Sequence, residues 1–231
     1  MQFRIATYNI HKCRGLDWKE SPARILSVIN EVAADVIAIQ EIFANQVSYF
    51  CNHLQVFHYF GVTRKLAGRE YGNVLFSRFP LAESRSYDLT VKRSEPRQCL
   101  RADLNLKADK ILHIFAVHLG TSFFERRHQA QKLLSPEVLR DPTLNGPRIL
   151  LGDFNEWTRG RVTQALSQDL QSADLRLHAG RRRTYPGVLP FWHLDHVYYD
   201  KELQLNRFQI HKTQISLIAS DHLPLVAEFK L

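Results

Sequence analysis

The segment Ile149–Trp157 (ILLGDFNEW) constrains the fold more than any other part of the chain. A short apolar run ends at Gly152, and Asp153 and Asn155 follow it. A buried strand can carry a carboxylate at its end only where water, a cation or a hydrogen-bond network compensates the charge. Because residues two positions apart on an extended segment point the same way, the side chains of Asp153 and Asn155 can reach one site. The segment therefore predicts a strand that ends in a polar site.

A second polar cluster lies near the end of the sequence, where Ser220, Asp221 and His222 separate two apolar runs. One such cluster can be a turn. Two of them in one chain indicate carboxylates and a histidine gathered around a divalent cation and a phosphate.

The first part of the chain has the pattern of a strand, a helix and a second strand. Phe3–Ile10 alternates like a strand, and Ser21 followed by Pro22 is typical of a helix start. Apolar residues then recur with helical spacing, and the buried segment VIAIQEI follows Asp35. The three elements span about 40 residues, the size of a βαβ unit.

Strands and helices are mixed along the rest of the chain. Further strands are expected at Val74–Phe76, Leu100–Leu106, Ile111–Leu119, Ile149–Leu151, Leu194–Tyr199 and Leu225–Phe229, and helices at Phe124–Leu134 and near Val162–Leu170. The hairpin expected around residues 108–110 breaks the alternation of a simple parallel sheet. We therefore predict one domain over residues 1–231, with two packed mixed sheets and helices outside them.

Polar residues stand at the ends of several expected strands. They are Asn9, Glu41, His118, Asp153 with Asn155, Asp195, and Asp221 with His222. Each alone has a structural explanation, such as a loop cap, a turn, or a core histidine bonded to a backbone carbonyl. Together they can converge on one rim of a sandwich, where α/β proteins place their sites.

The residue types at these strand ends favour Mg²⁺ or Mn²⁺. Carboxylate and amide oxygens are hard ligands, and none of these residues is a cysteine, which zinc would favour. Histidines beside carboxylates can act as acid, base or transition-state stabiliser. A metal, an imidazole and amide donors together suit a phosphodiester whose transition state gathers negative charge.

Seven motifs, in order, resemble the endonuclease/exonuclease/phosphatase superfamily. They are TYNIH, IQE, GNVLFSRFPL, VHLG, GDFN, LDHVYY and SDHLPL, and the resemblance spans residues 3–229. The superfamily includes DNase I, exonuclease III-type enzymes, inositol polyphosphate 5-phosphatases and neutral sphingomyelinases. The resemblance implies a four-layer α/β sandwich of the DNase I type and a metal-dependent phosphoesterase.

The resemblance also implies which residues bind the metal. Glu41 matches the principal metal-binding glutamate, Asn9 an asparagine beside that metal, and Asp221 a metal-linked aspartate.

The remaining motif residues match catalytic positions. Asp153 matches the residue that positions or deprotonates the attacking water, and Asn155 a phosphate or metal contact. His222 matches the histidine that contacts the scissile phosphate, and Asp195 the aspartate that orients it. His118 matches the second histidine of DNase I and the sphingomyelinases, where exonuclease III-type enzymes have a tyrosine. That difference disfavours a dedicated abasic-site endonuclease.

Three further residues are candidates for substrate binding. Arg97 and Arg101 flank the start of a central strand and can clamp a phosphate, or they can be exposed charges on an edge strand. Asn73, in GNVLFSR, can hydrogen-bond within the site.

The net charge of the chain does not decide between the possible substrate classes. A formal net charge of +8 favours polyanions such as nucleic acid or a phospholipid headgroup, and it also aids solubility. The run Arg181–Arg183 can be a phosphate-contacting edge or a solvated loop. The alternative function is a non-catalytic protein that binds anions or nucleic acid through the same fold.

The cysteines and the hydropathy bear on location. The three cysteines form no CxxC pair, which disfavours a disulfide framework and fits a reducing compartment. No stretch approaches the roughly 20 apolar residues needed to cross a bilayer. A cytoplasmic protein is therefore expected.

Overall fold

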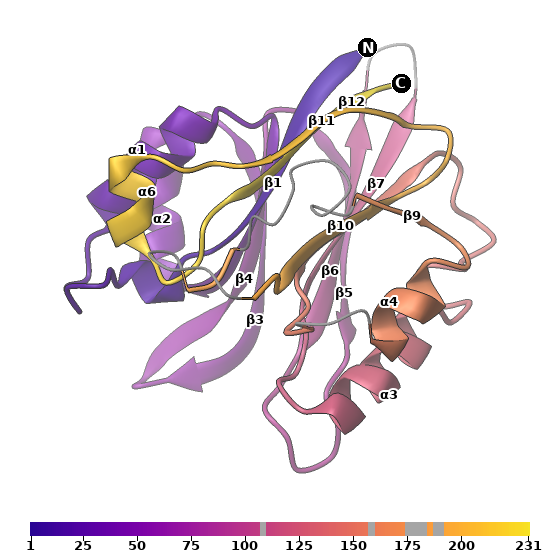
Figure 1. The fold of residues 1–231 in the computed structure, drawn as a ribbon, viewed down its shortest axis with the longest axis horizontal. Helices are drawn as coiled ribbons and strands as arrows, with labels where there is room; N and C mark the ends of the chain where they lie inside the picture. Colours follow the sequence, from indigo (N-terminus) through magenta and orange to yellow (C-terminus); the bar gives the residue numbers. More distant parts are fainter. Residues whose placement is uncertain (107–109, 157–159, 174–183, 187–191) are drawn as a thin grey trace.

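Two β-sheets packed face to face form the centre of the molecule (Figure 1). The computed structural model describes residues 1–106, 110–156, 160–173, 184–186 and 192–231. Within these residues each sheet has six strands. Helices cover the outer face of each sheet, so the predicted four-layer α/β sandwich is confirmed.

The first sheet has the strand order β11-β12-β1-β2-β4-β3. Its strands are β1 (Gln2–Asn9), β2 (Val36–Phe43), β3 (Phe57–Leu66), β4 (Arg69–Ser77), β11 (Gln204–Ile210) and β12 (Leu225–Lys230). The second sheet has the order β5-β6-β7-β8-β10-β9. Its strands are β5 (Leu81–Asp88), β6 (Gln98–Asn105), β7 (Ile111–His118), β8 (Arg148–Asp153), β9 (Gln171–Ser172) and β10 (Asp195–Tyr199).

Both sheets follow the same plan. A central parallel pair, β1 with β2 or β7 with β8, is flanked by antiparallel strands. In the first sheet the flanking strands are β12 and β4, and in the second they are β6 and β10. The C-terminal ends of the parallel strands therefore lie beside the N-terminal ends of their antiparallel neighbours. One edge of each sheet collects both kinds of strand end.

The core between the sheets is built by alternation along the strands. Ile5, Ala38, Ile114, Leu151 and Val197 all belong to this layer and are buried. Intervening positions face outward into two further apolar clusters, one on the outside of each sheet. Each strand thus presents every second side chain to the space between the sheets.

The helices lie on the two outer faces. Helices α1 (Pro22–Val32), α2 (Ala44–His53) and α6 (Gln214–Ala219) lie beside the first sheet, and α3 (Phe123–Leu133) and α4 (Arg161–Leu166) lie beside the second (Figure 1). The hydroxyl of Ser21 accepts a hydrogen bond from the backbone NH of Arg24, so the predicted start of α1 is confirmed. None of the described helices is long and apolar enough to cross a membrane.

Several elements had not been predicted from the sequence. They are α2, α6, β3, β5, β9 and β11. β3 and β5 are edge strands with many half-exposed or exposed residues, so their apolar and polar positions do not alternate cleanly. The predicted helix near Val162–Leu170 is shorter, because α4 ends at Leu166 and turns follow. The run Arg181–Arg183, proposed as a phosphate-contacting edge or a solvated loop, lies outside the described residues.

Candidate active site

Strand alternation brings three of the predicted residues together at one end of the sandwich. Asn9, His118 and Asp153 are the last residues of β1, β7 and β8. Each lies an even number of positions beyond a residue of the inter-sheet core, and therefore faces inward. His118 pairs with Asp153 across the parallel strands, and Asp195 pairs with Asp153 across the antiparallel ones.

Glu41 reaches the same place through a β-bulge. Ile39 pairs with Val74 and Ile42 pairs with Gly72, so β2 carries one residue more than β4 at this point. Ile39 and Ile42 both pack in the outer cluster, although they are three positions apart. Glu41 has a left-handed backbone with φ of 59° and its side chain accepts a hydrogen bond from Asn9 Nδ2 at 3.2 Å. The bulge therefore re-aims the carboxylate toward the site.

Asp153 is the centre of the cluster. Its Oδ2 accepts a hydrogen bond from Asn9 Nδ2 at 3.1 Å, and its Oδ1 accepts one from the backbone NH of Asn155 at 2.9 Å. The Nε2 atoms of His118 and His222 each lie 3.7 Å from Oδ2. Asp153 is only 1% exposed, so its charge is compensated by these groups rather than by bulk water.

Asn155 sits at the turn that follows β8. Its backbone is left-handed, with φ of 50°, and its side-chain NH₂ donates to the carbonyl of Leu119 at 2.9 Å. This bond joins the ends of β7 and β8 and fixes the direction of the amide group. The backbone of Asn155 thus contacts Asp153, but the segment is not extended there as predicted, and the Asn155 side chain bonds to the end of β7 instead.

His222 and Asp195 form a buried pair. Nδ1 of His222 lies 3.0 Å from Oδ2 of Asp195, and Asp195 is fully buried. Burial opposes protonation of His222, but the charges of Asp195, Asp153 and Asp221 outweigh it and raise the pKa of His222 to about 10. At neutral pH the imidazole is therefore a cation, with Nε2 directed toward Asp153.

His118 has the opposite protonation state. Burial and the nearby guanidinium of Arg97 lower the pKa of His118 to about 4, despite the carboxylates of Asp153 and Glu41. At neutral pH, the site thus holds a neutral and a cationic imidazole beside the same carboxylate oxygen of Asp153. Pairs of titratable groups whose pKa values are pushed apart are typical of acid–base sites.

Glu41 is held in its charged form. Burial would raise the pKa of Glu41, but His118, Lys12 and Asn9 together hold it well below the usual range. The ammonium of Lys12 lies 2.6 Å from Oε2. On the other side, burial and then the charge of Glu41 raise the pKa of the Tyr71 hydroxyl, which keeps that group protonated.

The loop before β12 completes the site. The hydroxyl of Ser220 donates to the backbone carbonyl of Asn9 at 2.8 Å, and it accepts from the backbone NH of His222 at 3.3 Å. Nδ1 of His11 lies 3.9 Å from Oδ1 of Asp221. The ring of Tyr185 lies 4.8 Å from the ring of His222, measured between centroids. These contacts tie the loop at 220–222 to the end of β1.

The donor set fits a divalent cation. Four carboxylates, those of Glu41, Asp153, Asp195 and Asp221, face two cationic side chains, those of Lys12 and His222. Carboxylate and amide oxygens are the ligands that Mg²⁺ and Mn²⁺ prefer, and Asp195 Oδ1 has no hydrogen-bond partner among the described residues.

Two groups of residues could hold such a cation. Ligand atoms of Asp153, Asp195 and His222 all lie within 4.8 Å of one another. In that group, however, the positive charge of the protonated His222 opposes metal binding by the imidazole. Glu41 and Asp221, from the neighbouring loop, offer oxygens alone and are the better candidates. Asn9 lies beside Glu41, with its amide nitrogen on Glu41 and Asp153 and its oxygen on the backbone NH of His11.

Two of the three predicted substrate-binding residues lie near the site. Asn73 is buried in β4, with the same strand parity as Tyr71 and Leu75 of the inner face. Arg97 directly precedes β6, and its charge acts on His118.

Arg101 is not brought to the cluster. Its guanidinium bonds both oxygens of Asp103, at 2.8 and 2.6 Å, and also contacts Asp141 and the hydroxyl of Tyr87. Nδ1 of His113 lies 2.7 Å from the same Asp103 carboxylate. Arg101 belongs to this buried network on the outer face of the second sheet.

Sequence reasoning missed three residues that contact the cluster. They are Lys12, Tyr71 and Tyr185. Lys12 directly follows the motif TYNIH, so proximity in sequence could have drawn attention to it. Tyr71 and Tyr185 carry no such signal, since only strand pairing and loop packing bring them close.

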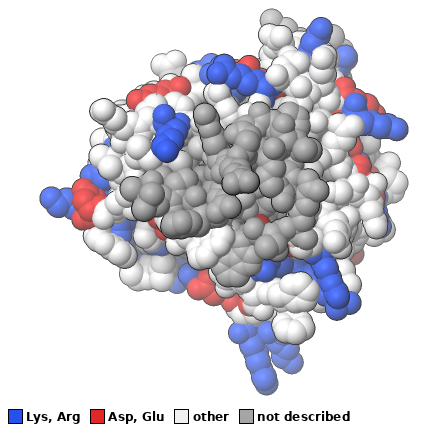
Figure 2. Space-filling model, viewed as in Figure 1, with Lys and Arg blue, Asp and Glu red and all other residues white. Residues whose placement is uncertain are grey.

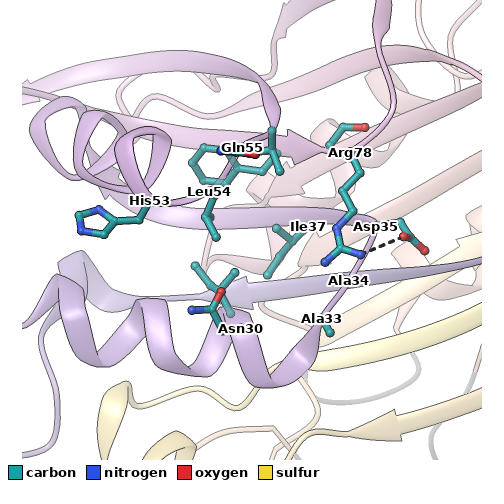
Figure 3. Close-up of a pocket in the computed structure, with 13 residues that line it drawn as sticks. Asn30, Ala33, Ala34, Asp35, Ile37, His53, Leu54, Gln55 and Arg78 are labelled. Carbon is teal, nitrogen blue, oxygen red and sulfur yellow. Dashed lines mark ion pairs between the residues drawn. The ribbon is translucent and has the colours of Figure 1, made fainter.

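Among the described residues, the basic side chains are dispersed and one pocket lies away from the cluster. Figure 2 shows lysine and arginine side chains at several separate places on the described part of one face. A pocket of about 370 Å³ lies at the other end of the first sheet, between the C-terminal ends of α1 and α2 (Figure 3). It is lined by Asp35 and Arg78, which form an ion pair at 3.6 Å, and by none of the predicted site residues.

Comparisons with known proteins agree on one family. The profile of the Endonuclease/Exonuclease/phosphatase family matches residues 6–222. The chain is 27% identical over 252 aligned positions to the uncharacterized protein YbhP of Escherichia coli K12, covering 99% of this chain and 96% of that protein.

Solved structures show the same fold. A functionally unknown conserved protein from Enterococcus faecalis superposes with a TM-score of 0.85 at 21% identity, covering 98% of this chain and 99% of that one. A mannosyl-6-phosphatase from Bacteroides thetaiotaomicron gives a TM-score of 0.80 at 18% identity, with coverage of 99% and 100%.

Proposed function

The chain belongs to the endonuclease/exonuclease/phosphatase family, and from that premise we propose that it hydrolyses a phosphodiester with the help of Mg²⁺ or Mn²⁺. One observation carries the proposal. Asp153 Oδ2 lies 3.7 Å from the Nε2 atoms of both His118 and His222. Because the first imidazole is neutral and the second cationic at neutral pH, one carboxylate oxygen has both a proton acceptor and a proton donor beside it.

Glu41 and Asp221 are the residues proposed to hold the metal, with Asn9 beside it. A divalent cation there supplies positive charge to the phosphate oxygens and so favours the charged transition state. The low pKa of Glu41 keeps its carboxylate ionised across the physiological range, as a metal ligand requires.

Asp153 is proposed to position the attacking water and to accept its proton. Its hydrogen bonds from Asn9 and from the backbone of Asn155 fix the carboxylate between the ends of β1 and β8. A base fixed in this way holds the water in line with the scissile bond, so less orientational entropy is lost when the reaction occurs.

His222 is proposed to bind the scissile phosphate as a cation. Asp195 holds the ring through Nδ1, which leaves Nε2 directed into the site. A protonated imidazole stabilises negative charge on a phosphoryl oxygen, and it can donate its proton to the leaving oxygen. His118 and Asn155 are proposed to lie beside the phosphate, and Asn73 and Arg97 to contact the rest of the substrate.

The proposed substrates are nucleic acid and phospholipid headgroups. The net charge of +8 favours either class. The similarity to a mannosyl-6-phosphatase adds phosphorylated sugars as a class to be tested.

A metal-rescue activity panel tests the proposal. The protein is chelated, and Mg²⁺ or Mn²⁺ is returned with plasmid DNA, single-stranded DNA, RNA, sphingomyelin, anionic phospholipid, inositol phosphates or mannose 6-phosphate. Metal-dependent turnover of one class, lost in His222→Ala and Asp153→Ala and kept in the remote variant Asp169→Asn, supports a phosphoesterase and identifies the substrate, and only turnover of a diester supports the phosphodiesterase. Turnover that persists in both site variants would refute the mechanism. Silence on every substrate, with salt-sensitive binding of nucleic acid, would favour a non-catalytic binder.

A further inference from the structure

Three consecutive residues after β1 have a left-handed backbone. The φ angles of His11, Lys12 and Cys13 are 44°, 61° and 56°. None of them is glycine, so this conformation is unfavourable at each position and persists only where the surroundings enforce it. Backbone strain of this kind is common at functional sites, so the direction of the side chains in this segment is of interest.

The surroundings hold this turn at both ends. Asn9 Oδ1 accepts a hydrogen bond from the backbone NH of His11 at 3.1 Å, and Gln46 Nε2 donates to the carbonyl of Lys12 at 2.8 Å. The side chain of Cys13 packs in the outer core of the first sheet and is 1% exposed. The position of the Lys12 backbone is therefore fixed by its neighbours.

The turn directs Lys12 at Glu41. Nζ lies 2.6 Å from Oε2, and the two side chains are 25% and 19% exposed. The other oxygen of the carboxylate, Oε1, accepts a hydrogen bond from Asn9. Both oxygens of Glu41 are thus engaged by groups of this chain, and a short charge-assisted hydrogen bond is among the stronger kinds in proteins.

We propose that Lys12 is a tethered cation that competes with the divalent metal for Glu41. The inference rests on the proposed function, in which Glu41 is a metal ligand. A metal that binds Oε2 meets an ammonium already in contact with that atom, and the two positive charges repel each other. Lys12 must therefore leave Glu41 when the metal binds. Its flexible side chain, on a rigid backbone, can then turn toward the negatively charged substrate.

The competition predicts tighter metal binding once Lys12 is removed. Binding of Mn²⁺ to the substrate-free protein is measured by calorimetry and by the loss of the free-ion paramagnetic resonance signal. Lys12→Met is expected to bind Mn²⁺ roughly tenfold or more tightly than the unchanged protein, the order expected for loss of a charge-assisted hydrogen bond. Lys19→Met removes the same charge from an exposed position of the same loop and is expected to have little effect.

Two further variants separate the possible failures. Glu41→Gln should lose most Mn²⁺ binding, and if it does not, the proposed metal site is wrong. If Glu41→Gln loses binding while Lys12→Met binds as the unchanged protein does, only the role of Lys12 is refuted. Lys12→Gln keeps a polar side chain of similar reach and should also bind more tightly, which guards against a folding defect of the methionine variant.

A spectroscopic measurement follows the displacement directly. The ε-methylene NMR signal of Lys12 should shift when Mg²⁺ saturates the unchanged protein, and it should stay in place in Glu41→Gln. A Lys12 signal that does not respond to saturating Mg²⁺ would show that the ion pair survives metal binding, which contradicts the proposal.

Discussion

Nδ1 of His222 lies 3.0 Å from Oδ2 of Asp195, although the two residues are 27 positions apart in the chain. Both side chains are buried, and Tyr185 covers the histidine ring. The carboxylate keeps the imidazole protonated and fixes which nitrogen faces Asp153. The protonation state of His222 is therefore set by tertiary structure.

Replacing Asp195 should lower the pKa of His222. In metal-free protein the imidazole should titrate near pH 10, and in Asp195→Asn well below that value, because the leading carboxylate charge is gone. Since the pKa is raised in the folded state, this contribution to stability is present below about pH 6.5 and is lost as the pH rises toward 10. Histidine NMR titration checks the shift, with Asp169→Asn as the control. An unchanged titration would contradict the assigned cause.

His118 should make the fold sensitive to acid. Its pKa of about 4 lies below the value of about 6.5 expected in the unfolded chain, so only the unfolded state takes up the proton between these values. The stability that His118 contributes is present above about pH 6.5 and falls by roughly 3 kcal/mol as the pH drops through 4. Urea unfolding at pH 7 and pH 5 should show that the free energy of unfolding falls less on acidification in His118→Asn than in the unchanged protein. Parallel losses would argue against a depressed pKa.

Asp153→Asn should reduce kcat strongly while the protein stays folded. General-base groups contribute about 10²- to 10⁴-fold to rate, and the amide cannot accept the proton of water. The amide fills the same volume, and the control Asp141→Asn changes a carboxylate outside the site. The kcat values of both variants are compared by steady-state kinetics on the substrate that the activity panel identifies. Equal kcat values for both variants would remove Asp153 from the mechanism.

Gly152→Ala should damage both the stability and the site. Gly152 has φ of 146°, and an added Cβ would collide with the backbone carbonyl of Val117 on the neighbouring strand. Gly68 also has a positive φ, of 76°, but nothing lies near its missing Cβ. Urea unfolding should therefore show a loss of about 1 kcal/mol for Gly68→Ala and a clearly larger loss for Gly152→Ala. A milder effect at position 152 would mean that β7 and β8 can separate there.

Arg101 and Arg97 should respond differently to substitution. Arg101→Met leaves the buried carboxylate of Asp103 without its cation and should destabilise the fold by about 3–5 kcal/mol, with kcat of the folded fraction retained. Arg97→Met should raise KM and raise the pKa of His118, because the guanidinium charge opposes protonation there. Unfolding curves and kinetics on both variants test the contrast. A KM effect of Arg101→Met without loss of stability would restore Arg101 as a substrate contact.

Much of the site followed from the sequence because it depends on local pattern. Alternation along β1, β7 and β8 places Asn9, His118 and Asp153 on the inner face once the core positions are known. The strand ends and the start of α1 are set by neighbouring residues in the chain, so motif spacing and capping signals predict them. The order of the motifs indicated the same family that the profile match shows.

Only the tertiary structure decided the rest. Simple alternation would turn Glu41 to the outer face with Ile39, and the bulge that reverses it exists only where β2 pairs with β4. Arg97 and Arg101 look alike in sequence, yet only Arg101 forms ion pairs with Asp103 and Asp141. The contact between Lys12 and Glu41 depends on a turn that Gln46 enforces. Strand pairing, bulges and ion pairs join residues that are distant in the chain, and a local sequence pattern cannot identify such partners.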